Sequence, residues 1–197
     1  MHEQLLDPAT LPAGQLARRQ RVLDGAASLL REAEYDAIEV RDVAKAADVS
    51  LATVYRYFPS KEILFGSVLA DWAASSATTA ARSRPAAPTT EAEIRAAMRR
   101  AVKAYERFPQ MVRVLMMLES STDPRVRTVY RQFAERSVGA IVDASNRDDV
   151  VADIVDAAYG VLNTKLRAWV FGLTSIGQVD RAVQRCLDLI FSPAPLA

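Results

Sequence analysis

The amino-acid sequence predicts an all-α fold of about nine helices, arranged as a small N-terminal three-helix domain and a larger C-terminal helical bundle. Apolar residues recur at three- and four-residue steps along most of the chain, which is the period of an amphipathic helix. No strand-type alternation continues for more than a few residues. Alanine and arginine are abundant, while only 7 of the 197 residues are glycine, and this composition favours helices.

The N-terminal part of the chain divides into an arm and three helices. Residues 1–14 contain two prolines and no apolar periodicity, so we expect a flexible arm there. The next segment, 15–65, contains a first helix, a break at "EYDAIEV", a second helix over 40–47, the turn "DVS" and a third helix over 51–58. Segment 15–65 is therefore predicted to be one small domain.

The remaining residues, 66–197, are predicted to form the larger bundle. A linking helix over 60–80 begins at Ser60, which is a suitable N-cap residue. The proline-containing segment "SRPAAPTT" then predicts a loop over 83–90. Periodicity predicts five further helices, over 91–108, 110–121, 123–145, 148–173 and 177–191.

The composition excludes several kinds of site. The single cysteine, Cys186, cannot form an intrachain disulfide. Together with the single histidine, His2, it provides too few ligands for a Cys/His zinc site. A Ser-His-Asp relay would have to use His2, which lies in the predicted arm. No apolar run is long enough to span a membrane, and the N-terminus lacks a signal-peptide pattern. We therefore expect a cytoplasmic protein with no membrane partner, catalytic residue, metal or cofactor.

Residues 40–59 combine the features of a helix-turn-helix. Two helices that cross closely need small residues at the contact, and Ala44 and Ala47 are suitably placed. Asp48 stands in the turn, where a residue tolerant of positive φ is needed, and Ser50 can cap the second helix. Three apolar residues are expected to lock the pair: Val43, Val49 and Val54.

The second helix of this motif has the side chains that reading a DNA major groove requires. Arg56 provides a donor fork for guanine, and the short side chains of Ala52 and Thr53 can meet a base edge or a thymine methyl group. Phosphate contacts are predicted for Tyr55, Tyr57 and Lys61. Phe58 is predicted to be a core residue. Because 15–65 holds equal numbers of cationic and anionic residues, any DNA-binding surface depends on how these charges are arranged.

The block from 18 to 69 resembles the DNA-binding domain of the TetR family of bacterial transcriptional regulators. The resemblance is carried by Tyr35 after the first helix, by "VRDVAKAADVS" and by "TVYRYFPSKE". It implies that the domain binds a palindromic operator as part of a dimer and usually represses transcription. The start of the third helix, Leu51 and Ala52, departs from the common Lys-Gly, which places a phosphate contact from position 51 in doubt. The operator-contacting residues that the resemblance implies are Arg41, Ala52, Thr53, Tyr55, Arg56, Tyr57 and Lys61.

For the C-terminal bundle, the resemblance implies a homodimer that holds a small-molecule effector. The apolar stripes of 148–173 and 177–191 are expected to pair with their symmetry mates; the alternative is that they are buried within one subunit. Segment 161–191 is also similar, more weakly, to actinobacterial TetR regulators of steroid and lipid catabolism, which implies a lipophilic ligand or its coenzyme A thioester. The pocket candidates, each of which could also be a plain core residue, are Met98, Tyr105, Met111, Leu115, Met116, Phe133, Tyr159, Asn163 and Trp169.

These observations predict a homodimeric, ligand-released repressor that binds double-stranded operator DNA. Two other functions remain compatible with an all-α chain. A helical enzyme would need a buried acid, base or metal cluster, whereas the sequence offers only scattered carboxylates. A helical adaptor would use the aromatic residues of 55–58 to bind a protein partner and would not bind DNA.

Overall fold

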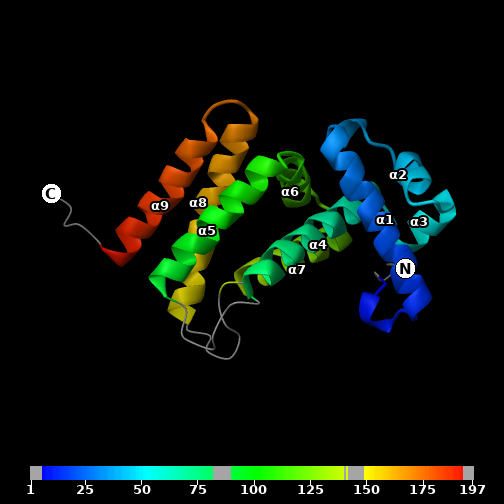
Figure 1. The fold of residues 1–197 in the computed structure, drawn as a ribbon, viewed down its shortest axis with the longest axis horizontal. Helices are drawn as coiled ribbons and strands as arrows, with labels where there is room; N and C mark the ends of the chain where they lie inside the picture. Colours follow the sequence, from blue (N-terminus) through cyan, green and yellow to red (C-terminus); the bar gives the residue numbers. More distant parts are fainter. Residues whose placement is uncertain (1–5, 82–89, 140, 142–148, 193–197) are drawn as a thin grey trace. The chain divides into compact units, whose positions relative to one another are not determined.

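The computed structural model of the protein describes residues 6–81, 90–139, 141 and 149–192. These residues form nine α-helices and two 3-10 turns with no strand among them, which confirms the predicted all-α class (Figure 1). The 3-10 turns are η1 (Pro8–Thr10) and η2 (Tyr35–Ala37). The helices are α1 (Ala13–Glu32), α2 (Val40–Ala46), α3 (Leu51–Tyr57), α4 (Lys61–Ala81), α5 (Glu91–Arg107), α6 (Gln110–Ser120), α7 (Pro124–Gly139), α8 (Asp149–Val170) and α9 (Ile176–Phe191).

The predicted flexible arm over 1–14 needs correction where the structure describes it. Residues 1–5 lie outside the described ranges, but Pro8–Thr10 form the turn η1, in which the Asp7 carboxylate accepts the Ala9 N–H at 2.9 Å. Helix α1 already begins at Ala13, directly after Pro12. Proline fixes φ near the helical value and lacks the N–H that a helix start leaves unpaired, so a helix can begin directly beside it.

The helices form two compact units, and the first unit is larger than the predicted 15–65 domain. It continues along α4 to Ala73 and also includes Arg113–Phe133, which covers most of α6 and the start of α7. Gly66 on α4 explains this association. A Cβ atom at position 66 would lie 2.7 Å from Leu118 Cδ2 and 2.9 Å from Val129 Cγ1. Glycine therefore lets α6 and α7 pack directly against the α4 backbone.

The core of the first unit is built on the apolar face of α1. Val22 and Ala26 are fully buried, and Leu30 is almost fully buried. The predicted break after α1 is confirmed by η2, where the Tyr35 ring packs edge-on against Phe65 of α4 at 5.3 Å between centroids. The predicted N-cap of α4 is also confirmed, because Ser60 Oγ accepts the Ile63 N–H at 3.3 Å.

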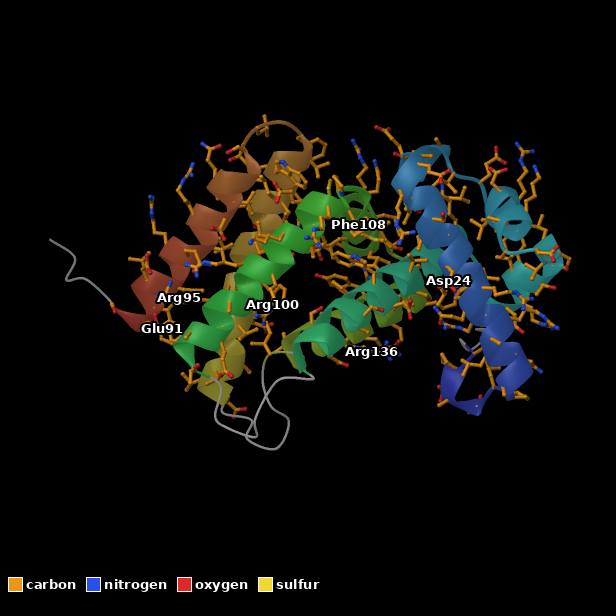
Figure 2. The ribbon with its side chains drawn as sticks, viewed as in Figure 1. Asp24, Glu91, Arg95, Arg100, Phe108 and Arg136 are labelled. Atoms are coloured by element: carbon orange, nitrogen blue, oxygen red, sulfur yellow. The ribbon has the colours of Figure 1, made fainter. Side chains whose placement is uncertain are left out.

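The second unit contains α5, α8 and α9, which lie side by side in Figure 1. Each helix buries one apolar stripe; these are Ile94, Met98, Val102 and Tyr105 on α5, Val155, Ala158, Leu162 and Leu166 on α8, and Val179, Val183 and Leu187 on α9. Arg95, labelled in Figure 2, ties α5 to α9 by pairing with Asp188 at 2.9 Å and donating to the Gln184 carbonyl at 3.2 Å.

Two predicted segments extend beyond the described ranges. Residues 83–89 of the predicted loop lie outside them, and so do residues 140 and 142–145 of the helix predicted over 123–145. None of the helices in the described ranges combines the length and the apolar content needed to cross a membrane.

Candidate nucleic-acid interface

The turn between α2 and α3 has the backbone conformation that the sequence predicts. Asp48 has φ of 51°, the only positive φ at a non-glycine residue in the described ranges. The Val49 N–H donates to the Ala44 carbonyl at 3.0 Å, and the Asp48 N–H donates to the Lys45 carbonyl at 3.2 Å. These two bonds around a left-handed residue form a Schellman motif, which ends α2 and redirects the chain into α3. Aspartate tolerates this conformation better than most residues with a Cβ.

The crossing of the helices depends on small residues. Ala44 and Ala47 are buried as predicted, together with Val43 and Val54. Gly25 on α1, which no sequence pattern singles out, also contributes, because a Cβ atom there would lie only 3.3 Å from the Ala47 backbone nitrogen. Glycine at this position permits the close approach of α1 to the end of α2.

Helix α3 begins at Ser50 and presents one face to solvent. Ser50 Oγ accepts the Thr53 N–H at 3.2 Å, which confirms the predicted cap, and lies 2.8 Å from Thr53 Oγ1. Thr53 is half-buried by this arrangement. The exposed residues of the helix are Leu51, Ala52, Tyr55 and Arg56.

The prediction that Tyr57 is a surface residue is wrong. Its side chain is only 3% exposed, because position 57 follows Val54 by three residues and so shares its buried face. Phe58 is also buried, as predicted. The Tyr57 hydroxyl accepts a hydrogen bond from Arg56 Nη2 at 3.3 Å, and the Arg56 guanidinium lies 5.1 Å from the Tyr57 ring centroid. Tyr57 therefore supports the side chain of Arg56.

Lys61, at the start of α4, is held by uncharged groups. Its Nζ atom lies 4.4 Å from the Tyr35 ring centroid and donates to the Asp36 carbonyl at 3.4 Å. Burial raises the pKa of the Tyr35 hydroxyl, and the nearby carboxylates of Glu62 and Asp36 raise it further. The ring therefore stays neutral and offers its face to the ammonium group.

Arg41, on the first turn of α2, is held differently. It forms a two-point ion pair with Glu39, in which Nε lies 2.8 Å from Oε2 and Nη2 donates to Oε1 at 2.9 Å. Both side chains remain more than half exposed, so this ion pair lies at the surface of the protein.

The nine predicted pocket residues are distributed over both units. Leu115, Met116 and Phe133 belong to the first unit, and the other six belong to the second. Five are almost completely buried: Met98, Tyr105, Met111, Leu115 and Phe133. Met116, Tyr159, Asn163 and Trp169 are half-buried. The burial of the first five residues agrees with a core role. The ligand pocket itself stays a prediction.

Tyr159, on α8, has a hydrogen-bond partner on α7. Its hydroxyl donates to the Ser137 carbonyl at 3.5 Å, and burial raises its pKa to about 12, partly opposed by the charge of Arg100. Arg100, labelled in Figure 2, is one of four exposed cations on α5, which are Arg99, Arg100, Lys103 and Arg107. Within the described ranges, no three His, Cys, Asp or Glu residues are grouped so that they could hold a metal ion.

Comparison with known proteins identifies the helix-turn-helix domain. Residues 22–68 match the family model "Bacterial regulatory proteins, tetR family". The HTH-type transcriptional repressor KstR of Rhodococcus jostii is 27% identical over 180 residues, which cover 89% of this chain and 84% of that protein. KstR of Mycobacterium tuberculosis is 46% identical over 55 residues, which cover 28% of this chain and 25% of that protein.

Solved structures show the same fold over nearly the whole chain. A TetR transcriptional regulator from Rhodococcus sp. RHA1 has a TM-score of 0.75 at 23% identity, covering 93% of this chain and all of that one. FadR of Thermus thermophilus, a TetR-family repressor solved with lauroyl-CoA, has a TM-score of 0.63 at 17% identity, covering 91% of this chain and 98% of that one. Residues 22–68 thus match the TetR family of bacterial regulatory proteins, and most of the chain is similar in sequence to a KstR transcriptional repressor and in fold to TetR-family regulators.

Proposed function

We propose that this regulator binds a palindromic operator as a homodimer, represses transcription and is released by a small lipophilic ligand. The main support is the exposed face of α3, which follows the Asp48 turn and presents Arg56 beside small side chains. Such a helix fits the major groove, where an arginine fork pairs with guanine.

The operator contacts divide between bases and phosphates. Arg56, Ala52 and Thr53 contact base edges, and Arg56 is oriented for this by the Tyr57 ring and hydroxyl. Phosphate contacts come from Tyr55, Lys61 and Arg41, all on the surface of the first unit. Tyr57, which the sequence predicts as a contact, acts in this proposal only through Arg56.

The homodimer forms through α8 and α9. Besides its buried stripe, each helix carries a second apolar stripe that is exposed or half-exposed in the described chain. The residues of these stripes are Val150, Ile154, Ala157, Val161 and Ala168 on α8, and Ala182, Cys186 and Leu189 on α9. A two-fold pairing of α8 and α9 with their symmetry mates covers both stripes in a four-helix interface.

The ligand is lipophilic, as a fatty acyl or steroid-like coenzyme A thioester. Support comes from two FadR proteins of the same fold, solved with lauroyl-CoA and stearoyl-CoA. The α5 helix fits a thioester, because its buried face carries Met98 and Tyr105 while its exposed face carries four cations that can pair with phosphates. Ligand binding favours a subunit geometry that no longer matches the operator, with a coupling of about 1–3 kcal/mol.

A binding assay with DNA from the vicinity of the chain's own gene tests this proposal. Fluorescence anisotropy should show salt-dependent, sequence-preferring binding, and stearoyl-CoA should weaken it while free coenzyme A should not. Absence of salt-dependent binding to any DNA, together with a stable complex with another protein, would favour the adaptor function instead. DNA binding that no acyl-CoA or steroid acid weakens would refute the ligand part alone.

A further inference from the structure

The first turn of α2 contains an unusual pair of side chains. Glu39 occupies the N-cap position, where serine, threonine, aspartate and asparagine are the favoured residues. The Asp42 carboxylate accepts the Glu39 backbone N–H at 3.3 Å and so contributes to the cap. Both carboxylate oxygens of Glu39 contact the guanidinium of Arg41.

The Glu39–Arg41 pair uses the same arginine atoms that a phosphate would use. A carboxylate and a phosphate both accept two parallel N–H bonds from a guanidinium fork, with similar spacing of their oxygens. In this pair the fork is occupied through Nε and Nη2, at 2.8 and 2.9 Å. Arg41 therefore cannot offer this edge to a phosphate until Glu39 has moved away.

The other two cations proposed to contact DNA are held without a carboxylate. Arg56 contacts the ring and hydroxyl of Tyr57, and Lys61 contacts the Tyr35 ring and a backbone carbonyl. These partners orient the two cations without a direct ion pair. Of these three cations, Arg41 alone is paired with a carboxylate in the described residues.

We propose that Glu39 competes with DNA phosphate for Arg41 and thereby lowers the operator affinity of the regulator. This inference rests on the proposed function, and specifically on a phosphate contact by Arg41. When DNA binds, the phosphate takes the fork of Arg41 and the ion pair between Glu39 and Arg41 is lost. This loss opposes binding, and it is largest at low salt, where the ion pair is screened least.

The test is a set of DNA titrations with Glu39→Gln, which keeps the size of the side chain and removes its charge. Operator binding should become about three- to tenfold tighter at roughly 50 mM salt, and the gain should shrink as salt is raised. The slope of log K against log salt should become steeper by up to about 0.9. Glu34→Gln is the matched control, because Glu34 is also exposed, lies on the same connection and makes no side-chain cap bond.

A double-mutant cycle shows whether Glu39 acts through Arg41. In an Arg41→Met background, Glu39→Gln should tighten binding no more than Glu34→Gln does. Glu39→Thr provides a second test, because threonine is a favoured N-cap residue that keeps the start of α2 and also lacks a carboxylate. It should tighten binding as Glu39→Gln does.

The outcomes separate this inference from the proposed function. If the unmodified protein binds no DNA, the proposed function fails. If it binds, but both Glu39 variants gain no more than Glu34→Gln, or the gain persists without Arg41, then Glu39 does not compete for Arg41 and the inference is overturned.

Discussion

Single residues decide how the helix-turn-helix presents its reading face. Arg56 is exposed, but the buried Tyr57 beside it holds the guanidinium through its ring and its hydroxyl. The turn that aims the helix depends on Asp48, whose φ is 51°. Sequence patterns could identify the Asp48 turn, because the requirement for positive φ is local. The burial of Tyr57 could also have been found from its three-residue spacing after Val54.

Substitution of Asp48 tests the strain in the turn. Asp48→Val should lower the free energy of unfolding by about 1–2 kcal/mol, because a β-branched residue is poorly accommodated at positive φ. Asp48→Gly should leave it unchanged within about 0.5 kcal/mol or raise it, since glycine adopts this conformation freely. Urea denaturation monitored by circular dichroism measures both. Equal stabilities of the valine and glycine variants would contradict the assigned backbone conformation.

Whole elements are placed by close approaches that the sequence pattern does not reveal. The periodicity of α4 predicts a helix, but only the structure shows that Gly66 lies against Leu118 and Val129. For the same reason, the assignment of Arg113–Phe133 to the first unit could not be predicted, since it depends on contacts between segments far apart in the sequence. Local periodicity predicts helices well, and tertiary packing decides how they group.

The packing at Gly66 predicts opposite effects for two glycine-to-alanine substitutions. Gly66→Ala should lower the free energy of unfolding by about 1–3 kcal/mol, because the added methyl group overlaps Leu118 and Val129. Gly160→Ala on α8 is the control, since no atom lies within 4 Å of its added Cβ, and it should raise stability by about 0.5–1 kcal/mol. The two changes are compared by thermal and urea unfolding. If Gly66→Ala stabilised the protein, the packing of α6 and α7 against α4 would have to be less tight than the structure shows.

At the scale of the whole molecule, the proposed regulator depends on two copies of the chain. Two recognition helices must lie roughly 34–36 Å apart to reach successive major grooves on one face of DNA. The α8 and α9 surfaces are the proposed means of holding them there. The sequence could predict these helices but not which stripes remain exposed, because each helix carries two apolar stripes and only packing distinguishes them.

A charge placed on the α9 stripe tests the dimer. Leu189 is 62% exposed in the described chain. The unmodified protein should sediment as a dimer, with twice the chain mass of 21.6 kDa, and Leu189→Arg should sediment as a monomer. An arginine buried in an apolar interface lacks a partner, which makes association unfavourable. Leu16→Arg on α1 is the control and should leave the mass unchanged. Sedimentation velocity measures both, and a dimeric Leu189→Arg variant would place the interface elsewhere.

In the proposed complex, Arg56 on α3 reads bases while Lys61 at the start of α4 holds the phosphate backbone. Anisotropy titrations of operator and scrambled DNA over a salt series test this division of roles. Arg56→Ala should lose about 1–3 kcal/mol of preference for the operator, whereas Lys61→Ala should weaken binding to both DNAs equally and reduce the salt slope by about 1. Equal loss of affinity for both DNAs in Arg56→Ala, with sequence preference intact, would show that Arg56 does not read bases.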